Sequence, residues 1–204
     1  MKQLGFFFDA RRCNGCKTCV VACKDAHNLS VGRNFRHVLE VTDGKWSKDP
    51  KSGAWKQNVY AYYLSIACNH CSDPACVKAC PTGAHHKRTE DGLVVINTDK
   101  CIGCGNCAKA CPYGAPELDE KAHKMTKCDA CLNRLEQGLQ PICVEACPQR
   151  ALEFGDIEEL RKKHGNNAAI APLPDPAETK PCLTIRPCAS AKPSGFKGGT
   201  AHRF

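Results

Sequence analysis

The chain has 204 residues, of which 18 are cysteine and only 6% are aromatic, so its apolar core must be thin and disulfides or metals are expected to hold the fold together. The longest apolar stretch, residues 59–68, contains Ser65 and is too short to cross a bilayer. The formal net charge of +8 is common among nucleic-acid-binding proteins, so that class stays open until the cofactors are counted.

The N-terminal segment leads into a first group of cysteines. Residues 4–8 are apolar but no small-residue cleavage site follows them, so we expect no signal peptide. Residues 7–9 predict a short strand that ends in a turn before a ligand loop. The first group has gaps of two, two and three residues and consists of Cys13, Cys16, Cys19 and Cys23. Lys24, and not a proline, follows its last cysteine.

An insertion separates the first group from the second. Residues 31–58 are rich in glycine, lysine and aspartate, and we interpret them as this insertion. Residues 59–66 alternate imperfectly between apolar and polar, which predicts a buried strand that enters the second group. This group has gaps of two, four and three residues and consists of Cys68, Cys71, Cys76 and Cys80.

The pattern repeats twice more along the chain. Residues 93–96 predict another strand, after a turn at residues 90–92. The third group has the spacing of the first and consists of Cys101, Cys104, Cys107 and Cys111. The fourth group has gaps of two, eleven and three residues and consists of Cys128, Cys131, Cys143 and Cys147. A proline follows the last cysteine in groups two, three and four.

The C-terminal region predicts a helix and then a tail. Asp156 is a good N-cap for a helix over residues 156–164, and Gly165 is a good stop signal. From residue 171 onward, proline and glycine dominate. We expect an extended tail over a partner or over the chain's own surface, and a disordered tail is the alternative.

The spacing within the groups predicts iron–sulfur clusters. Two residues between cysteines let consecutive thiolates reach one small inorganic core, and Gly15, Gly103 and Gly105 permit the tight turns. Three further residues carry the last cysteine away from that core, and a proline fixes the exit of the chain. Structural zinc takes two Cys-x2-Cys pairs and does not use a third cysteine followed by Cys-Pro. A disulfide framework does not use such close, regular spacing. Sixteen ligands therefore predict four 4Fe–4S clusters.

The clusters also account for the charge. An oxidised 4Fe–4S core with four thiolates carries a net charge of about −2, so four of them offset the +8 of the polypeptide. A nearly neutral loaded protein argues against nucleic-acid binding. No serine–histidine–aspartate set, phosphate loop or paired carboxylates indicates an enzyme.

Several residues near the groups have no assigned role. Cys182 and Cys188 lack cluster spacing and are expected to be free thiols, with an extra metal or redox role as the alternative. His85 and His86 are expected at the surface, although a histidine near a cluster could tune its potential. The cationic residues near the fourth group are Lys127, Arg134 and Arg150. They could balance cluster charge or be ordinary solvated residues, and the sequence leaves both interpretations open.

Together these motifs resemble a known family. CNGCKTCVVACKD, CNHCSDPACVKACPTGA, CIGCGNCAKACPYGAP and KCDACLNRLEQGLQPICVEACPQRALEFG are similar to the electron-transfer subunits of molybdopterin oxidoreductases of the dimethyl sulfoxide reductase type, with the sulfoxide branch the closest. The resemblance implies an α+β fold of two interleaved bacterial ferredoxin-like modules with an insertion and an extended C-terminal tail. One module would comprise residues 1–30 and 120–155 and the other residues 59–119, with the insertion at 31–58 and the helix and tail at 156–204.

The resemblance further implies that the last cysteine of each group binds the neighbouring cluster. Cluster 1 would be held by Cys13, Cys16, Cys19 and Cys147. Cluster 2 would be held by Cys68, Cys71, Cys76 and Cys111. Cluster 3 would be held by Cys101, Cys104, Cys107 and Cys80. Cluster 4 would be held by Cys128, Cys131, Cys143 and Cys23.

The family also implies partners. The protein would be a non-catalytic subunit of an anaerobic respiratory complex, between a membrane anchor that oxidises quinol and a catalytic subunit with a molybdenum–pterin cofactor. It would reach the cytoplasmic membrane only through these partners, on a side that the sequence does not decide. The alternatives are the same role in a thiosulfate, polysulfide or tetrathionate reductase or a formate dehydrogenase, or a free polyferredoxin.

Overall fold

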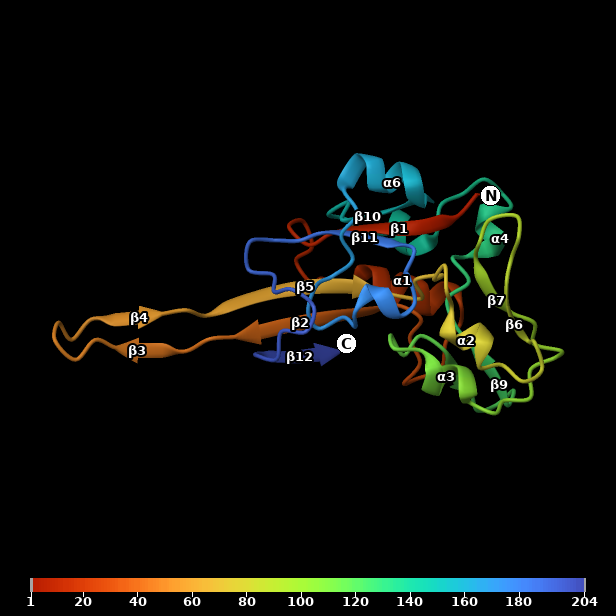
Figure 1. Ribbon diagram of the computed structural model, residues 1–204, viewed down its shortest axis with the longest axis horizontal. Helices are drawn as coiled ribbons and strands as arrows, with labels where there is room; N and C mark the ends of the chain where they lie inside the picture. The colour runs from red at the N-terminus through yellow and green to blue at the C-terminus, as the bar shows by residue number, and fades with distance from the viewer. Residues whose placement is uncertain (1, 204) are drawn as a thin grey trace.

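The computed structural model describes residues 2–203 and consists of short strands and short helices (Figure 1). The strands are β1 (Leu4–Asp9), β2 (His37–Asp43), β3 (Trp46–Lys48), β4 (Trp55–Gln57), β5 (Tyr60–Ile66), β6 (His85–Lys87), β7 (Val94–Ile96), β8 (Glu117–Asp119), β9 (Lys124–Thr126), β10 (Leu152–Asp156), β11 (Leu183–Arg186) and β12 (Thr200–Arg203). The helices are α1 (Thr18–Ala26), α2 (Ala75–Lys78), α3 (Asn106–Ala110), α4 (Leu132–Leu135), α5 (Ile142–Glu145), α6 (Ile157–His164) and the 3₁₀ helix η1 (Pro176–Glu178).

A three-stranded sheet in the order β10-β1-β11 joins the N-terminal strand to two strands from the C-terminal part of the chain. β1 confirms the strand expected at residues 7–9 but begins earlier, at Leu4. Phe6 lies opposite Phe154 of β10, which runs antiparallel, and opposite Leu183 of β11, which runs parallel. β11 belongs to the C-terminal tail and its first three residues are buried, so this part of the tail is built into the body of the protein.

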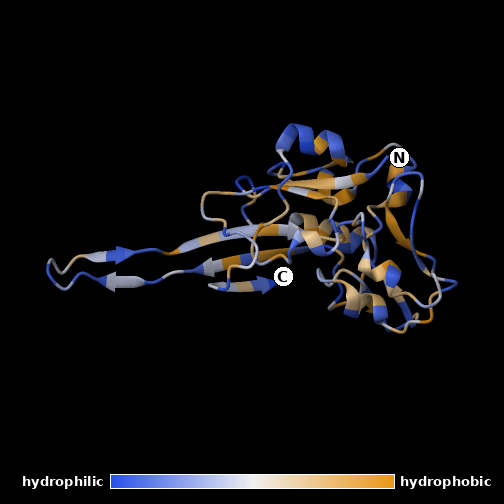
Figure 2. Cartoon of the chain, in the orientation of Figure 1, coloured by the Kyte–Doolittle hydropathy of each residue, from blue (hydrophilic) through white to orange (hydrophobic). Residues whose placement is uncertain are grey.

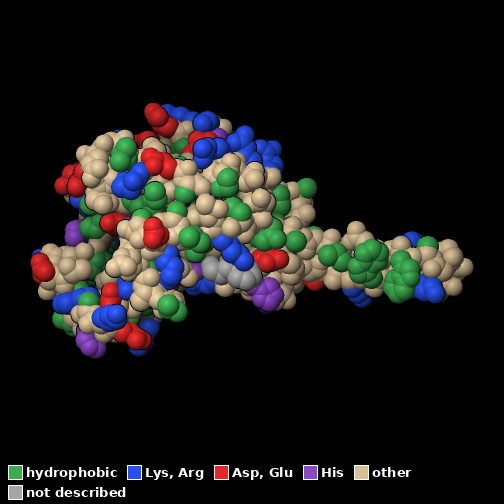
Figure 3. All heavy atoms as spheres, turned by 180° about the vertical axis from the view of Figure 1, so that it is seen from behind, with side chains coloured by type: hydrophobic (Ala, Val, Ile, Leu, Met, Phe, Trp, Pro, Cys, Tyr) green, Lys and Arg blue, Asp and Glu red, His purple; other side chains and the backbone are tan. Residues whose placement is uncertain are grey.

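A second sheet, in the order β12-β2-β5, continues into a long projection. β5 confirms the buried strand predicted at residues 59–66, and it pairs along its whole length with β2. The predicted insertion forms β2, β3 and β4. We call residues 44–59 the arm, since this β3–β4 ribbon extends far beyond the body (Figures 1 and 3). Trp46 and Trp55 of the arm are 63% and 64% exposed.

The middle of the chain forms two small two-stranded β-ribbons. β6 pairs with β7, which is the strand predicted at residues 93–96, and β8 pairs with β9. Helices α2 and α3, from cysteine groups two and three, pack against each other. Helix α1, from group one, packs against α5, from group four. The packing of helices therefore brings together group one with four and group two with three.

The buried side chains divide the body into two regions. In the sheet half, residues 2–43, 60–67 and 128–203, aromatic and aliphatic side chains such as Phe8, Tyr62 and Leu64 form a conventional core. In the ribbon half, residues 68–127, three of the six buried members of the apolar cluster are cysteines. Figure 2 shows the apolar residues gathered within the body and a largely polar outer arm.

Helix α6 closes the sheet half as its sequence predicts. The side chain of Asp156 accepts hydrogen bonds from the backbone N–H groups of Glu158 and Glu159, at 2.9 and 3.3 Å. Gly165 ends the helix with φ at +89°, a conformation that glycine adopts without steric cost. Within residues 2–203, every helix is too short or too polar to cross a membrane.

Candidate metal centres

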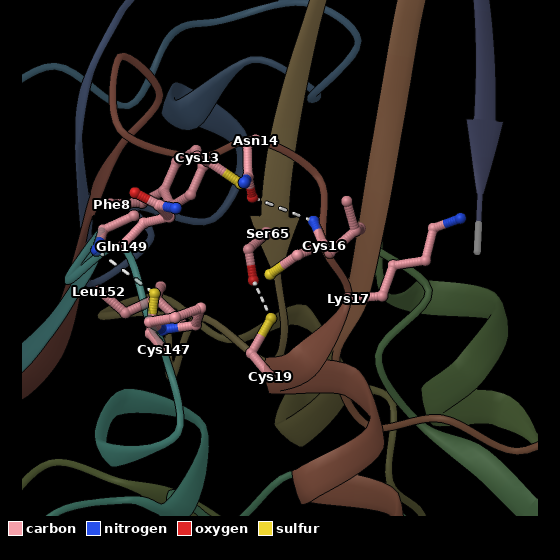
Figure 4. Close-up of a pocket in the computed structure, with 13 residues that line it drawn as sticks. Phe8, Cys13, Asn14, Cys16, Lys17, Cys19, Ser65, Cys147, Gln149 and Leu152 are labelled. Carbon is pink, nitrogen blue, oxygen red and sulfur yellow. Dashed lines mark hydrogen bonds between the residues drawn. The ribbon is translucent and has the colours of Figure 1, made fainter.

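Four cysteine sulfurs face one cavity between β1, α1 and the segment after α5 (Figure 4). Cys13 and Cys16 lie in the loop after β1, Cys19 lies in the first turn of α1, and Cys147 follows α5. Gly15 shapes the loop with φ at +73°, and a Cβ there would come within 2.5 Å of the Tyr63 ring. These four cysteines are the set predicted for cluster 1.

The chemistry of this cavity suits a cationic inorganic core. Burial, together with the nearby sulfurs of Cys19, Cys147 and Cys16, raises the pKa of Cys13 to about 11. Four ionised thiols at this place therefore need a positive charge among them. The hydroxyl of Ser65 lies 3.3 Å from Cys19 Sγ, and backbone N–H groups such as that of Ala151 donate to these sulfurs. Such donors stabilise thiolates and tune the potential of a cluster.

The thiols predicted for cluster 4 lie deeper in the body. Burial raises the pKa of Cys128, and neighbouring Cys23 and Cys143 raise it further. The ring of His27 lies between two of the predicted ligands, with Nδ1 3.8 Å from the sulfur of Cys23 and Nε2 3.9 Å from that of Cys131. The structure thus brings the last cysteine of group one to the first three of group four.

The thiols predicted for cluster 2 also face one another. Burial raises the pKa of Cys71 to about 12, and the sulfurs of Cys68 and Cys111 add to the effect. Burial likewise raises the pKa of Cys76 to about 12, with Cys68 and Cys111 among its charged neighbours. Cys111, the last cysteine of group three, therefore lies among the first three of group two.

The fourth set gathers in the ribbon half. Burial raises the pKa of Cys107 to about 11, with smaller contributions from the sulfurs of Cys101 and Cys104. Cys80 packs against the apolar cluster that contains Cys101 and Cys107. Its sulfur accepts a hydrogen bond of 3.4 Å from the backbone N–H of His85.

The residues present fit 4Fe–4S clusters better than single ions. The sulfurs in Figure 4 surround a space and do not meet at one point. Among residues 2–203, no three histidine, cysteine or acidic side chains converge as they do around a single ion. Zinc would require all four sulfurs within about 2.3 Å of one atom. We infer the fit from this spread of thiols, their burial and the N–H groups directed at them.

Buried cysteines connect the four sites in series. Cys19, Cys143 and Cys147 share one core cluster, which joins site 1 to site 4. A second cluster contains Cys23, Cys128 and Cys68, so site 4 adjoins site 2. A third contains Cys76, Cys101 and Cys107, so site 2 adjoins site 3. The order is 1–4–2–3, and its two ends carry the two exposed predicted ligands, which are Cys16 and Cys104.

Some buried polar residues were missed or misjudged from the sequence. Arg36 is 2% exposed inside the body, although it lies in the predicted insertion. His85 was expected at the surface and is buried, because its strand β6 pairs with β7 under the loop of group two, and burial lowers its pKa to about 4. His86 is exposed as expected. An alternating pattern across the short strand β6 is the signal that would have separated the two histidines.

The three cations left open by the sequence differ in their surroundings. Lys127 is buried, and its Nζ donates to the carbonyls of Val94 and Cys128. Arg134 is half-buried, with its side chain 24% exposed and paired with Glu145. Arg150 is exposed, and its Nη1 donates to the backbone carbonyl of Glu145 at 3.1 Å.

The two leftover thiols also differ. Both are free of disulfides, as expected. Cys182 is fully buried beside β1, where its carbonyl accepts a hydrogen bond from the N–H of Phe6 and its sulfur lies 3.4 Å from the hydroxyl of Ser72, so it is not in an exposed tail. Cys188 is half-buried. The proline-rich sequence did not reveal that β11 would carry Cys182 into the core.

Comparisons with known proteins identify the class of domain. Models of the 4Fe-4S dicluster domain match residues 9–84 and 59–157. The B subunit of the anaerobic dimethyl sulfoxide reductase of Escherichia coli K12 is 58% identical over 197 residues, covering 97% of this chain and 95% of that protein. The B subunit of the Haemophilus influenzae enzyme is 53% identical, covering 98% and 96%. The formate dehydrogenase iron-sulfur subunit of Wolinella succinogenes is 35% identical, covering 83% and 93%.

The matched domains and the four thiol sites define a ferredoxin-type protein with four 4Fe–4S clusters. Within this class, the two B subunits are more than half identical to this chain over nearly its full length. The protein belongs to the iron–sulfur subunits of the dimethyl sulfoxide reductase family.

Proposed function

We propose that this protein relays electrons through its four clusters from a quinol-oxidising membrane anchor to a molybdopterin catalytic subunit, as a non-catalytic subunit of an anaerobic dimethyl sulfoxide reductase. The observation that carries the proposal is the serial order of the four sites, with an exposed cysteine at each end. A relay requires such an order, because electrons must enter at one surface and leave at another.

The proposed ligand sets are cross-paired between groups one and four and between groups two and three. The packing of α1 against α5 and of α2 against α3 supports this pairing. It also supports two modules, one of residues 1–30 with 120–155 and one of residues 59–119. Each bound cluster accepts and returns one electron. The chain's own residues hold the thiols, exclude water from the inner sites and direct N–H groups at the sulfurs.

The proposed partners are a molybdopterin subunit and an integral-membrane anchor, through which the protein reaches the cytoplasmic membrane. The arm supports the existence of a partner. Trp46 and Trp55 lie on one face of its ribbon, since Trp46 pairs with Gln57 and Trp55 with Lys48, two positions apart. A two-stranded ribbon with exposed tryptophans is marginal in water and is typical of a surface that another protein covers.

Close relatives support dimethyl sulfoxide as the final electron acceptor. The two B subunits come from anaerobic dimethyl sulfoxide reductases and share more than half of their residues with this chain. The second candidate is the same role in a formate dehydrogenase, which the Wolinella succinogenes relative favours at lower identity. The native complex should be purified and assayed in two directions, with a reduced quinol analogue and dimethyl sulfoxide, and with formate and an oxidised quinone analogue. Reduction of dimethyl sulfoxide supports the first candidate, and formate oxidation supports the second.

The ligand sets are tested by serine substitution followed by iron analysis and electron paramagnetic resonance (EPR) spectroscopy. Cross-pairing predicts that Cys147→Ser and Cys13→Ser abolish the same cluster signal, although these residues belong to different groups. The matched control is Cys188→Ser, which removes a thiol outside the groups and should leave all four signals. If Cys147→Ser removed the same signal as Cys128→Ser instead, the proposed sets would be wrong.

A further inference from the structure

A guanidinium group lies inside the sheet half, at the junction of sites 1 and 4. Arg36 is 2% exposed and is the largest of the fully buried side chains. Its Nη1 donates to the carbonyl and hydroxyl oxygens of Ser65, at 3.3 and 3.1 Å. Its Cζ lies 4.9 Å from the centre of the Phe6 ring. These contacts fix the orientation of the side chain but do not neutralise its charge.

The other nitrogens of this guanidinium have no oxygen or nitrogen partner in the described part of the chain, whereas the sulfur of Cys143 interacts with the side chain. Neither Nε nor Nη2 of Arg36 forms a hydrogen bond within residues 2–203. A buried cation without an anionic partner is strongly destabilising. The Ser65 hydroxyl that accepts from Arg36 also lies 3.3 Å from the sulfur of Cys19, so the guanidinium is one hydroxyl away from a proposed ligand. Burial alone would lower the pKa of Arg36, but the cysteine thiolates around it raise the pKa instead. They are Cys143, Cys19, Cys128 and Cys23.

These thiols come from both of the clusters proposed for groups one and four. Cys19 is a proposed ligand of cluster 1, and Cys143, Cys128 and Cys23 are proposed ligands of cluster 4. Each loaded site carries a net charge of about −2, which becomes about −3 when the cluster is reduced. A fixed cation in a medium of low dielectric constant stabilises the more negative form.

We propose that Arg36 is a shared counter-cation of clusters 1 and 4 and that it raises the reduction potentials of both. The inference rests on the proposed ligand sets. Reduction adds one electron to one cluster and no proton to Arg36, which carries its proton in both states. Arg36 is therefore a positioning residue that acts by charge. Lys127 is not equivalent, because its Nζ donates to two backbone carbonyls, those of Val94 and Cys128.

The test is an anaerobic titration with dithionite, followed by EPR spectroscopy, of the complete native complex. The cluster signals are assigned beforehand from the serine variants of their ligands. In Arg36→Gln, we expect the midpoint potentials of clusters 1 and 4 to fall by at least 59 mV, which is a tenfold change for a one-electron couple. In Arg36→Lys the charge remains, so both potentials should stay within that margin of the wild type.

A matched control separates burial from mere proximity. Arg12 stands next to Cys13 in the sequence, but its side chain is 58% exposed. Water and salt screen such a charge, so Arg12→Gln should move no potential by as much as 59 mV. Clusters 2 and 3 serve as internal controls in every variant.

The outcomes discriminate between a role by charge and a role in packing. Unchanged potentials in Arg36→Gln, or equal shifts in all four clusters, would overturn the inference. If Arg36→Gln loses iron, the Arg36→Lys variant provides the test. Four clusters at native potentials in Arg36→Lys support the role of charge, and loss of clusters 1 and 4 contradicts it. Absence of four clusters from the wild type would instead refute the proposed function.

Discussion

The sheet half and the ribbon half are stabilised in different ways. The sheet half buries aromatic side chains between β1, β10 and β5, so residues other than cysteine make up most of its core. The ribbon half has two-stranded ribbons and very short helices, and cysteines make up half of its buried cluster. A metal cluster can thus replace a hydrophobic core in one part of a chain and merely be enclosed by a core in another.

The largest expected effect compares the third cysteines of groups one and three. Cys19 and Cys107 are both buried and have equivalent positions in the same spacing. In Cys107→Ser we expect loss of about half of the iron, because clusters 2 and 3 support each other in the absence of another core. In Cys19→Ser we expect loss of about a quarter. Iron analysis of anaerobically purified protein measures both, and equal losses would refute the comparison.

Truncation of buried apolar side chains should also have different effects in the sheet half and in the ribbon half. Leu64→Ala, in the sheet half, should lower the free energy of unfolding by about 2–5 kcal/mol while the iron content stays complete. Met125 is buried in the ribbon half, and its side chain belongs to the small apolar cluster that contains Cys101 and Cys107. Met125→Ala should therefore reduce the iron content of purified protein. Thermal unfolding and iron analysis distinguish the two responses.

The arm differs from both halves, because it encloses nothing. Replacing Trp46 and Trp55 together by serine should leave iron content and thermal stability unchanged, since both side chains are exposed. If a partner covers the arm, the substitution should weaken its binding by about 2 kcal/mol or more. Co-purification and titration of the partner subunits measure this loss. Full binding by the double variant would exclude the arm from the interface.

A smaller effect is expected at the N-terminus of α6. Asp156→Ala removes the side chain that accepts two backbone N–H groups and should cost about 1 kcal/mol. Faster hydrogen exchange should be confined to α6 of the sheet half. Asp156→Asn retains an acceptor and is the matched control. Faster exchange in the ribbon half would show that the halves are not independent.

The smallest effect concerns pH. Burial by itself would raise the pKa of Glu153, but hydrogen bonds from Lys163 and His164 outweigh it, so the pKa is lowered. The stabilisation is therefore complete above the unfolded pKa of about 4.3 and is lost as the pH falls through the lower folded value. Compared with Glu153→Gln, we expect α6 to be more protected from hydrogen exchange at pH 6 by about 0.5 kcal/mol. A difference that grows toward pH 4 would contradict this sign.

Sequence reasoning succeeded where the chemistry is local. The spacing of cysteines predicted the clusters, because consecutive ligands separated by two residues reach one core whatever the rest of the polypeptide does. Asp156 and Gly165 predicted both ends of α6, because capping involves only neighbouring residues. The strand at residues 59–66 was visible in its apolar character, and β5 confirms it.

Sequence reasoning failed where a residue's surroundings come from distant segments. Nothing in the segment around Arg36 indicates burial, since its environment is built from β1, β5 and two cysteine groups. The burial of His85 follows from the pairing of β6 with β7. From the sequence alone, a cationic residue is predicted to be solvated unless the anions that compensate its charge are near in the sequence.

The amino-acid sequence by itself determined the number and kind of cofactors, because metal ligation depends on residue type and short spacing. Only the tertiary structure decided the order of the four sites, the burial of Arg36 between two of them, the path of the tail and the projection of the arm. These features depend on contacts between residues far apart in the sequence, and such contacts form only when the whole polypeptide folds.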